Sequence, residues 1–192
     1  MEYLPQNEKV FQSAVNMVAH FEGLHLTPYL CPANHLTIGY GHVLRAGESH
    51  SPISKDIARV LLLNDFGDCV DHLHKVFPHL WDCQLFALAS LSYNIGTEWI
   101  RNGSNLCREV SALNRSQSKG GTNAQDQFNV KWYIKRYCHV KKNGKPSVLE
   151  GLLRRRFVEC DFFDGLIPDF RLYLVSEHYK TVLSNIKNKN YE

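Results

Sequence analysis

Residues 22–42 read EGLHLTPYLCPANHLTIGYGH, and they join an apolar helical pattern to a short glycine-rich hairpin. Glu22 stands at the end of the helical pattern, Cys31 on the hairpin and Thr37 on its second arm. The tripeptide at 32–34 is typical of a turn, because asparagine tolerates left-handed backbone angles. A carboxylic acid, a titratable thiol and a hydroxyl within sixteen residues predict a site for acid-assisted bond cleavage, as in a glycosidase.

The segment before this stretch has the periodicity of an amphipathic helix over residues 7–21. Its apolar residues recur every three or four positions, at Val10, Ala14, Met17, Val18 and Phe21. Gly23 marks the end of the helix, so Glu22 is expected in or just after the last turn. The C-terminal end of a helix disfavours a negative charge, and the neighbours are apolar, so we expect this carboxyl to hold its proton as a general acid does.

The rest of the chain predicts further helices. Ser54 is a good N-cap for a long helix that continues beyond Leu73, and an apolar helix from Asp82 ends at residues 94–96. The second of these is apolar on most of its circumference and is therefore expected at the centre of the protein. Other predicted segments are a short helix at 104–114, a polar loop at 116–129, a turn at 139–147, and helices at about 148–163 and 168–185.

These elements predict an α+β fold that is predominantly α, in a single domain over residues 1–192. A small β-hairpin lobe covers about residues 22–53. A larger helical lobe covers about residues 54–185 and includes the N-terminal helix at 7–21. The long helix after Ser54 joins the two lobes, and we expect a cleft between them.

The net charge of +3 is too small to indicate a nucleic-acid partner. Residues 131–160, however, hold nine basic and two acidic side chains, a local charge of +7. Such a surface attracts polyanions, including cell-wall polymer, but charge runs are also common on solvated helix faces. The purpose of this segment stays open at this point.

The six cysteines, at positions 31, 69, 83, 107, 138 and 160, form no CxxC pair. Their spacing fits neither a zinc finger nor a disulfide framework, so we expect them to be mostly reduced and mostly in the core. Cys69, His72, His74, His79 and Cys83 lie close together in sequence, but they match no known ligand spacing. No metal and no cofactor is therefore predicted.

Residues 1–9 lack the apolar region of a secretory signal, and the sequence has no run of eighteen apolar residues. These patterns predict a protein made in the cytoplasm, without stable insertion into a membrane.

Three motifs together resemble the tailed-phage lysozymes (endolysins) of glycoside hydrolase family 24. The first is Glu22 followed by Tyr-Leu-Cys-Pro at 29–32 and Thr-Ile-Gly-Tyr-Gly-His at 37–42, with the family spacing of eight residues from Glu22 to Cys31 and five from Cys31 to Thr37. The others are the central-helix motif ending in Tyr-Asn-Ile-Gly at 93–96 and the late motif GLLRRRFVE at 151–159. The resemblance covers about residues 9–164 and implies a lysozyme-like fold.

The resemblance implies hydrolysis of the β-1,4 bond between N-acetylmuramic acid and N-acetylglucosamine in bacterial peptidoglycan. Glu22 would be the general acid, and Cys31 and Thr37 would position the attacking water. Tyr40, His42 and Asn94 are candidate substrate contacts, although His42 and Asn94 also match positions that hold the hairpin and the cleft floor. The implied protein acts as a monomer on the cell wall after release from the host cytoplasm, through a separate holin-like protein.

Cys31 stands where many family members have aspartate and some have cysteine. Two other interpretations stay open. A lytic transglycosylase would cut the same bond with one acid/base and no water-positioning pair. A non-catalytic cationic protein would bind the wall through Lys141, Lys142 and Lys145.

Overall fold

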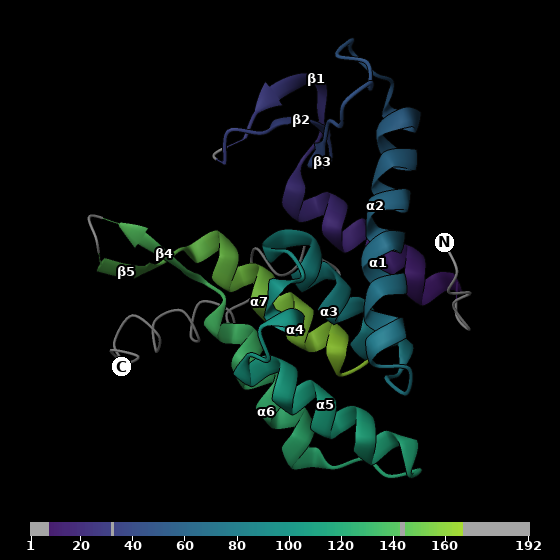
Figure 1. The fold of residues 1–192 in the computed structure, drawn as a ribbon, viewed down its shortest axis with the longest axis vertical. Coiled ribbons are helices and arrows are strands. Elements are labelled where there is room, and N and C mark those ends of the chain that lie inside the picture. Colours follow the sequence, from purple (N-terminus) through teal and green to yellow (C-terminus); the bar gives the residue numbers. More distant parts are fainter. Residues whose placement is uncertain (1–7, 32, 143–144, 167–192) are drawn as a thin grey trace.

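Helices dominate the order of elements, as the apolar periodicity predicts (Figure 1). The computed structural model describes residues 8–31, 33–142 and 145–166. Its elements are α1 (Glu8–Glu22), β1 (His25–Leu30), β2 (Leu36–Gly39), β3 (His42–Val43), α2 (Lys55–Val76), α3 (Asp82–Ile95), α4 (Glu98–Arg101), α5 (Asn105–Ser118), α6 (Ala124–Arg136), β4 (His139–Lys142), β5 (Lys145–Val148) and α7 (Glu150–Phe163). The predicted helix at 168–185 lies outside the described residues.

The first helix ends where the sequence predicts. Helix α1 buries Phe11, Ala14, Val15, Met17 and Val18 along one face, and Glu22 is its last residue. The amide of Gly23 donates to the carbonyl of Ala19, and Gly23 then turns the chain away with a φ of 73°. The helix therefore delivers the Glu22 carboxyl to the start of the hairpin.

Strands β1, β2 and β3 form an antiparallel sheet in that order. Tyr29 of β1 is paired with Thr37 of β2, which in turn is paired with Val43 of β3. Asn34 has a φ of 63° in the connecting turn, which confirms its predicted left-handed conformation. Figure 1 shows this small sheet beside the first turns of α2, with most of the other helices at the opposite end of α2.

Two helices build the centre of the protein. The Ser54 side chain caps α2 by accepting a hydrogen bond from the Ile57 amide at 3.2 Å, as predicted. Helix α3 is buried at every position from Gln84 to Ser92, and it packs against α1, α2 and α7. Gly96 ends α3 as the sequence predicts. Helix α3 is therefore the centre of the helical core, whereas the small sheet packs against α2.

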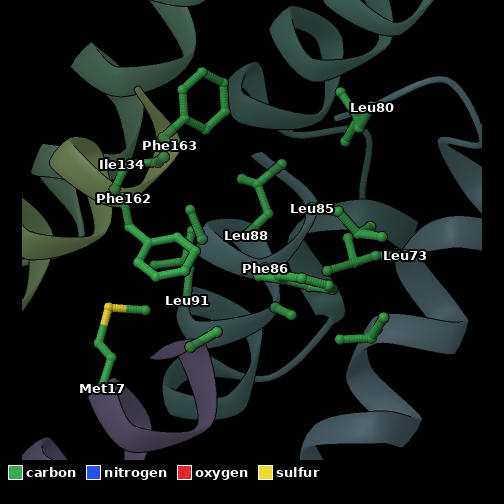
Figure 2. Close-up of a cluster of buried hydrophobic side chains, with 14 of the residues drawn as sticks. Met17, Leu73, Leu80, Leu85, Phe86, Leu88, Leu91, Ile134, Phe162 and Phe163 are labelled. Carbon is green, nitrogen blue, oxygen red and sulfur yellow. The ribbon is translucent and has the colours of Figure 1, made fainter. Parts of the chain in front are cut away.

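The core gathers around α3 (Figure 2). Phe86 contacts the rings of Phe11 and Phe66, with ring centroids 5.5 Å and 6.5 Å away. Other buried side chains come from α1, α2, α5, α6 and α7, and include Met17, Leu73, Leu113, Ile134 and Phe162. An aromatic side chain buries about 150–250 Å², so each of these rings is a large contribution to the core.

The predicted loop at 116–129 is wrong. Helix α5 continues to Ser118, and α6 begins at Ala124 after the Asn123 side chain accepts from the Gln125 amide at 2.9 Å. The sequence is polar here because α6 fully buries only Val130 and Ile134, and its other residues are half-buried or exposed. A helix with so narrow an apolar face resembles a loop in composition.

The turn predicted at 139–147 is part of a second β-hairpin. Strands β4 and β5 pair antiparallel, with His139 opposite Val148. This hairpin stands apart from the three-stranded sheet, and Figure 1 shows it on the other side of the space between the lobes. It leads directly into α7.

Candidate active site

The carboxyl of Glu22 is held by an arginine from the far end of the chain. Arg155 Nη1, on α7, donates to Glu22 Oε1 at 2.5 Å. The Arg155 side chain is 3 % exposed, whereas that of Glu22 is 20 % exposed and so reaches the surface. The apolar setting expected for Glu22 is therefore wrong, because its carboxyl lies against the guanidinium of Arg155. The sequence gives no sign that residues 22 and 155 meet.

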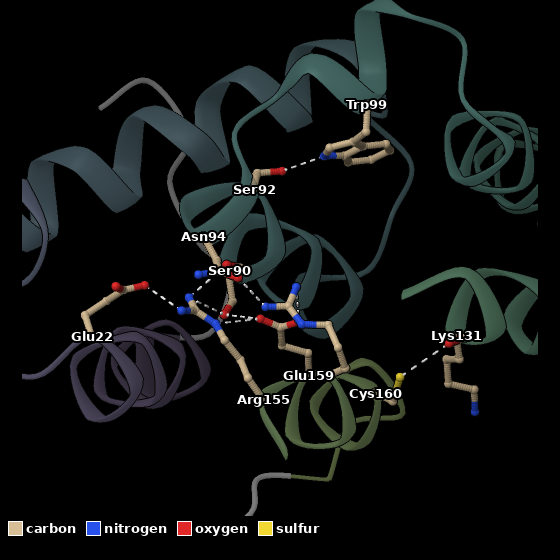
Figure 3. A network of polar contacts seen from close by, with 10 residues as sticks. Glu22, Ser90, Ser92, Asn94, Trp99, Lys131, Arg155, Glu159 and Cys160 are labelled. Atoms are coloured by element: carbon tan, nitrogen blue, oxygen red, sulfur yellow. Dashed lines mark hydrogen bonds and ion pairs between the residues drawn. The ribbon is translucent and has the colours of Figure 1, made fainter. Parts of the chain in front are cut away.

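Arg155 is itself fixed by groups on two helices (Figure 3). Its Nε donates to Glu159 Oε1 at 3.1 Å, and its Nη2 donates to the carbonyl oxygen of Ser90 at 3.0 Å. The Ser90 hydroxyl also donates to Glu159 Oε1 at 2.8 Å. A guanidinium with this many partners has one orientation, so it fixes the position of Glu22 Oε1.

A second arginine completes the buried network. Arg156 Nη1 lies 3.1 Å from Glu159 Oε2, as an ion pair without good hydrogen-bond geometry, and both side chains are fully buried. Arg156 Nη2 donates to Asn94 Oδ1 at 2.7 Å. The amide oxygen of Asn94 is thus engaged within the protein, which favours the structural role for this residue over substrate contact.

Cys31 and Thr37 lie on the opposite side, at the end of the small sheet. Cys31 directly follows β1, and its backbone amide donates to the His35 carbonyl at 2.9 Å across the turn. Thr37 lies in β2, and its side chain is buried. The two residues are therefore brought together, as their spacing predicts.

The thiol of Cys31 is activated by its surroundings. Hydrogen bonds from the backbone of His35, from the backbone of Ala33 and from the Thr37 side chain lower its pKa and outweigh the effect of burial. The Thr37 hydroxyl has one proton, which it donates either to the His35 carbonyl, 3.0 Å away, or to the sulfur. Donation to the sulfur stabilises the thiolate, the form that acts as a base.

Tyr29 is a site residue that the sequence reasoning missed. Burial raises the pKa of its phenol, and the charges of Glu22 and Cys31 raise it further. The phenol therefore lies within electrostatic reach of both groups, and it keeps its proton at neutral pH. Its sequence signal is its place in the Tyr-Leu-Cys-Pro motif at 29–32, two residues before Cys31.

Residues 40–42 form the turn that passes in front of Glu22. A Cβ atom placed on Gly41 would lie 3.5 Å from Glu22 Oε2, and Gly41 has a φ of 92°, so glycine suits this position. The carbonyl of Tyr40 accepts a hydrogen bond from the Tyr93 hydroxyl at 2.8 Å. The structure thus places the predicted residue Tyr40 beside the site, half-buried.

The imidazole of His42 points away from Glu22 toward α2. Its Nδ1 lies 2.7 Å from Asp65 Oδ2 and its Nε2 lies 3.1 Å from Glu48 Oε2, and the residue is 5 % exposed. Burial acts to lower the pKa of His42, but the hydrogen bonds and charges of Asp65 and Glu48 outweigh it, and the pKa is raised. Both ring nitrogens are engaged, which favours a role in holding the hairpin.

No group of three potential metal ligands lies together within residues 8–31, 33–142 and 145–166. All six cysteines are free. Cys138 and Cys160 are buried, whereas the other four are half-buried, and burial raises the pKa of Cys69 and of Cys160 to about 12. The pKa of the Cys31 thiol is lowered, whereas burial raises the pKa of the thiols of Cys69, Cys83, Cys138 and Cys160.

The site therefore places one carboxyl on the helical side and a thiol with a hydroxyl on the sheet side. A carboxylic acid can protonate a leaving oxygen, and a polar pair on the other side can hold the attacking water. A predominantly helical α+β fold with this arrangement defines a glycoside hydrolase of the lysozyme class.

Comparison with known proteins gives the family. The family model of the phage lysozymes matches residues 19–159, so the chain belongs to the phage lysozyme family. It is accordingly a muramidase, and peptidoglycan is the substrate. The predicted family, fold class and enzyme class are confirmed.

Individual relatives agree with this assignment. The endolysin of Acyrthosiphon pisum secondary endosymbiont phage 1 is 27% identical over 159 residues, which are 81% of this chain and 98% of that protein. The endolysin of Bacillus phage B103 is 32% identical over 80% of this chain, which spans about half (53%) of that longer protein. The muramidase domain of SpmX from Asticaccaulis excentricus has a TM-score of 0.67 at 25% identity, over 82% of this chain and 98% of that domain.

Proposed function

We propose that the chain is an endolysin that hydrolyses the β-1,4 bond between N-acetylmuramic acid and N-acetylglucosamine with inversion at the anomeric carbon. Glu22 is the general acid in this proposal, and Cys31 and Thr37 hold the water. The observation that carries it is the placement of Glu22, which Arg155 fixes facing a sheet whose Cys31 thiol has a lowered pKa.

The reaction follows from the protons that each group can move. The protonated Glu22 gives its proton to the glycosidic oxygen as the bond to the anomeric carbon breaks. Water attacks the anomeric carbon from the opposite face, and its proton passes to the Cys31 thiolate. Transfer of that proton to solvent and uptake of a proton by Glu22 restore the starting state. Because water attacks directly, the product has a free reducing end.

The two oxygens of Glu22 suit different tasks. Oε1 accepts the hydrogen bond from Arg155, whereas Oε2 faces the turn at Gly41. We assign the transferred proton to Oε2, since an oxygen that accepts from a guanidinium is the poorer site for a proton.

The proposed role of the chain is lysis of the host cell. The name endolysin of two relatives supports a role in lysis of the host cell. We propose that the chain acts on the wall as a monomer, after release through a separate holin-like protein. The part of the chain that the structure describes has no helix long and apolar enough to cross a membrane. Tyr40 is proposed as a substrate contact, whereas His42 and Asn94 are proposed to hold the hairpin and the network beneath the site.

A comparison of two glutamates of the same helix tests the acid. Glu22→Gln should lower the rate of turbidity loss of purified Gram-negative peptidoglycan about 10²-fold or more, the range expected for loss of a general acid. Glu8→Gln is the matched control, because Glu8 lies at the other end of α1, where its carboxylate accepts from Gln12 Nε2 at 2.9 Å. Lysis by Glu22→Gln at the wild-type rate would rule out the acid.

The products distinguish the alternatives. Mass spectrometry of the released fragments should show reducing ends, whereas 1,6-anhydro ends would indicate a lytic transglycosylase. In a killing assay, Glu22→Gln could leave the activity unchanged while substitution of Lys141, Lys142 and Lys145 by neutral residues abolishes it. That result would mean that the protein acts by binding the wall instead.

Substitution of the thiol tests the other half of the site. Cys31→Asp should keep activity, because a carboxylate can also hold and deprotonate water, whereas Cys31→Ala should lose it. Cys107→Ala, on α5, is the control for loss of a half-buried thiol and should keep the wild-type rate. Full activity of Cys31→Ala would show that the thiol has no part in catalysis.

A further inference from the structure

The side chain of Tyr93 lies between the hairpin turn and the proposed acid. It projects from the last turns of α3, and its hydroxyl donates to the carbonyl oxygen of Tyr40 at 2.8 Å. The same ring lies 3.8 Å from the position that a Cβ atom on Gly41 would occupy, and Glu22 Oε2 lies 3.5 Å from that position. Tyr93, Gly41 and the Glu22 carboxyl therefore meet at one point.

We propose that Tyr93 is a positioning residue for the reaction proposed above. Its hydroxyl ties the small sheet to the central helix, and it thereby sets the position of the turn at Gly41 against the carboxyl of Glu22. The proposal rests on the assignment of Glu22 as the acid and goes beyond it, since it concerns how the two halves of the site keep their separation.

The connections between the two halves explain why such a tie is needed. Glu22 is anchored to the helical lobe through Arg155, whereas Thr37 belongs to β2 of the small sheet. Along the chain the sheet is joined to α1 at Gly23, which has a φ of 73°, and to α2 by the segment that follows β3. Tyr40 directly follows β2, so a hydrogen bond to its carbonyl restrains the strand that carries Thr37.

The hydroxyl of Tyr93 is suited to be a permanent donor. Burial raises the pKa of this phenol well above its ordinary value, and the charges of Asp65 and Glu22 raise it further. The hydroxyl therefore keeps its proton at neutral pH. A carbonyl acceptor does not titrate, so the bond persists whatever the protonation state of Glu22.

Position matters in this chemistry because the acid and the water must approach the same bond from opposite faces. A displacement of about 1 Å at a catalytic group can lower the rate by as much as 10²-fold. The loss of one restraint among several should cost less. We expect about a tenfold lower kcat for Tyr93→Phe, with KM within about twofold of wild type, because the ring and the substrate contacts stay in place.

The neighbouring serine supplies a matched control. Ser92 lies next to Tyr93 on α3, and its hydroxyl accepts a hydrogen bond from Trp99 Nε1 at 3.0 Å on the side away from Glu22 (Figure 3). Ser92→Ala removes a buried hydrogen bond from the same helix without touching the turn. It should lower the unfolding temperature and leave kcat at the wild-type value.

The experiment measures kcat, KM and thermal unfolding for Tyr93→Phe and Ser92→Ala, each alone and combined with Glu22→Asp, on purified peptidoglycan fragments. Glu22→Asp keeps an acid but withdraws it by one methylene, so a group that acts by placing Glu22 should matter little in that background. The expected result is a lower kcat for Tyr93→Phe in the wild-type background and little further loss in the Glu22→Asp background.

Three outcomes would overturn the inference: wild-type kcat for Tyr93→Phe, an equal fold-loss in both backgrounds, or an equal loss of kcat for Ser92→Ala. In each of these the hydroxyl stabilises the fold without positioning the acid. Failure of the proposed function is distinguishable, because in that case Glu22→Gln itself would keep the wild-type rate.

Discussion

The His42–Asp65 pair predicts a loss of stability that depends on pH. Asp65→Asn removes the carboxylate that lies 2.7 Å from His42 Nδ1. The side chain of His42 is 6 % exposed and that of Asp65 is 19 % exposed, so the pair lies between the surface and the interior. Exposed pairs contribute about 0–1 kcal/mol, and removal of one partner from a buried pair costs about 3–5 kcal/mol. We therefore expect a loss of about 2 kcal/mol.

The sign of the pH dependence follows from the direction of the shift. The pKa of His42 is raised in the folded protein, so the imidazolium is more stable there than in the unfolded chain. This contribution is fully present below the unfolded pKa of about 6.5, and it is lost as the pH rises through the raised value. The difference between wild type and Asp65→Asn should thus be largest near pH 6 and should shrink at higher pH.

Thermal unfolding followed by circular dichroism tests this reasoning. For a protein of this size 1 kcal/mol corresponds to about 2–4 °C, so Asp65→Asn should unfold about 4–8 °C below wild type near pH 6. Asp68→Asn is the control, because Asp68 is an exposed carboxylate one turn later on α2. An equal loss near pH 6 and near pH 9, or the same loss for Asp68→Asn, would refute the role assigned to the imidazolium.

Three further predictions concern the acid, the thiol and the core. Arg155→Lys keeps the charge, but a lysine cannot donate to Glu22, Ser90 and Glu159 from one planar group. Lytic activity should therefore fall about tenfold or more. Wild-type activity would contradict the placement of Glu22 by the guanidinium. The pKa of Cys31 is lowered, chiefly by a hydrogen bond from the backbone of His35. The pH midpoint of its alkylation by iodoacetamide should therefore lie below the ordinary thiol pKa of about 8.5. A pH midpoint above that value would exclude the activation of this thiol. Phe86→Ala should lower the free energy of unfolding in urea by about 3–5 kcal/mol, whereas a loss below about 1 kcal/mol would mean that the ring is not central to the core.

The sequence predicts the elements whose signal is local. The end of α1 at Glu22, the capping of α2 by Ser54 and the left-handed turn at Asn34 all depend on a residue and its near neighbours. Helix α3 is also predicted, because it is apolar on nearly all sides and only a central position can bury it.

Elements with a weak apolar signal are not predicted. Helix α6 anchors through Val130 and Ile134 alone, and the rest of its polar sequence resembles a loop. The β4–β5 hairpin is likewise stabilised by backbone pairing that leaves no clear alternation of polar and apolar residues. In both cases the tertiary context decides the structure, and single-residue preferences do not.

The same distinction applies to the site. Glu22, Cys31 and Thr37 belong to one continuous segment, so their proximity follows from a hairpin of known length. Arg155 is 133 positions from Glu22, and its contact with the carboxyl depends on how α7 packs on α3. The motif at 151–159 resembles the family's late arginine motif, but it does not say whether Arg155 or Arg156 contacts Glu22.

The two consecutive arginines have different tasks because the helix points them in different directions. Arg155 turns toward the surface and ends on Glu22, while Arg156 turns inward and ends on Asn94. Glu159, one turn later, forms an ion pair with both, and Glu22 is a second carboxylate partner of Arg155. Removal of Glu159 would take one partner from each arginine at once, while Arg155 keeps Ser90 and Glu22 and Arg156 keeps Asn94. The position of the acid therefore depends in part on a side chain that is fully buried.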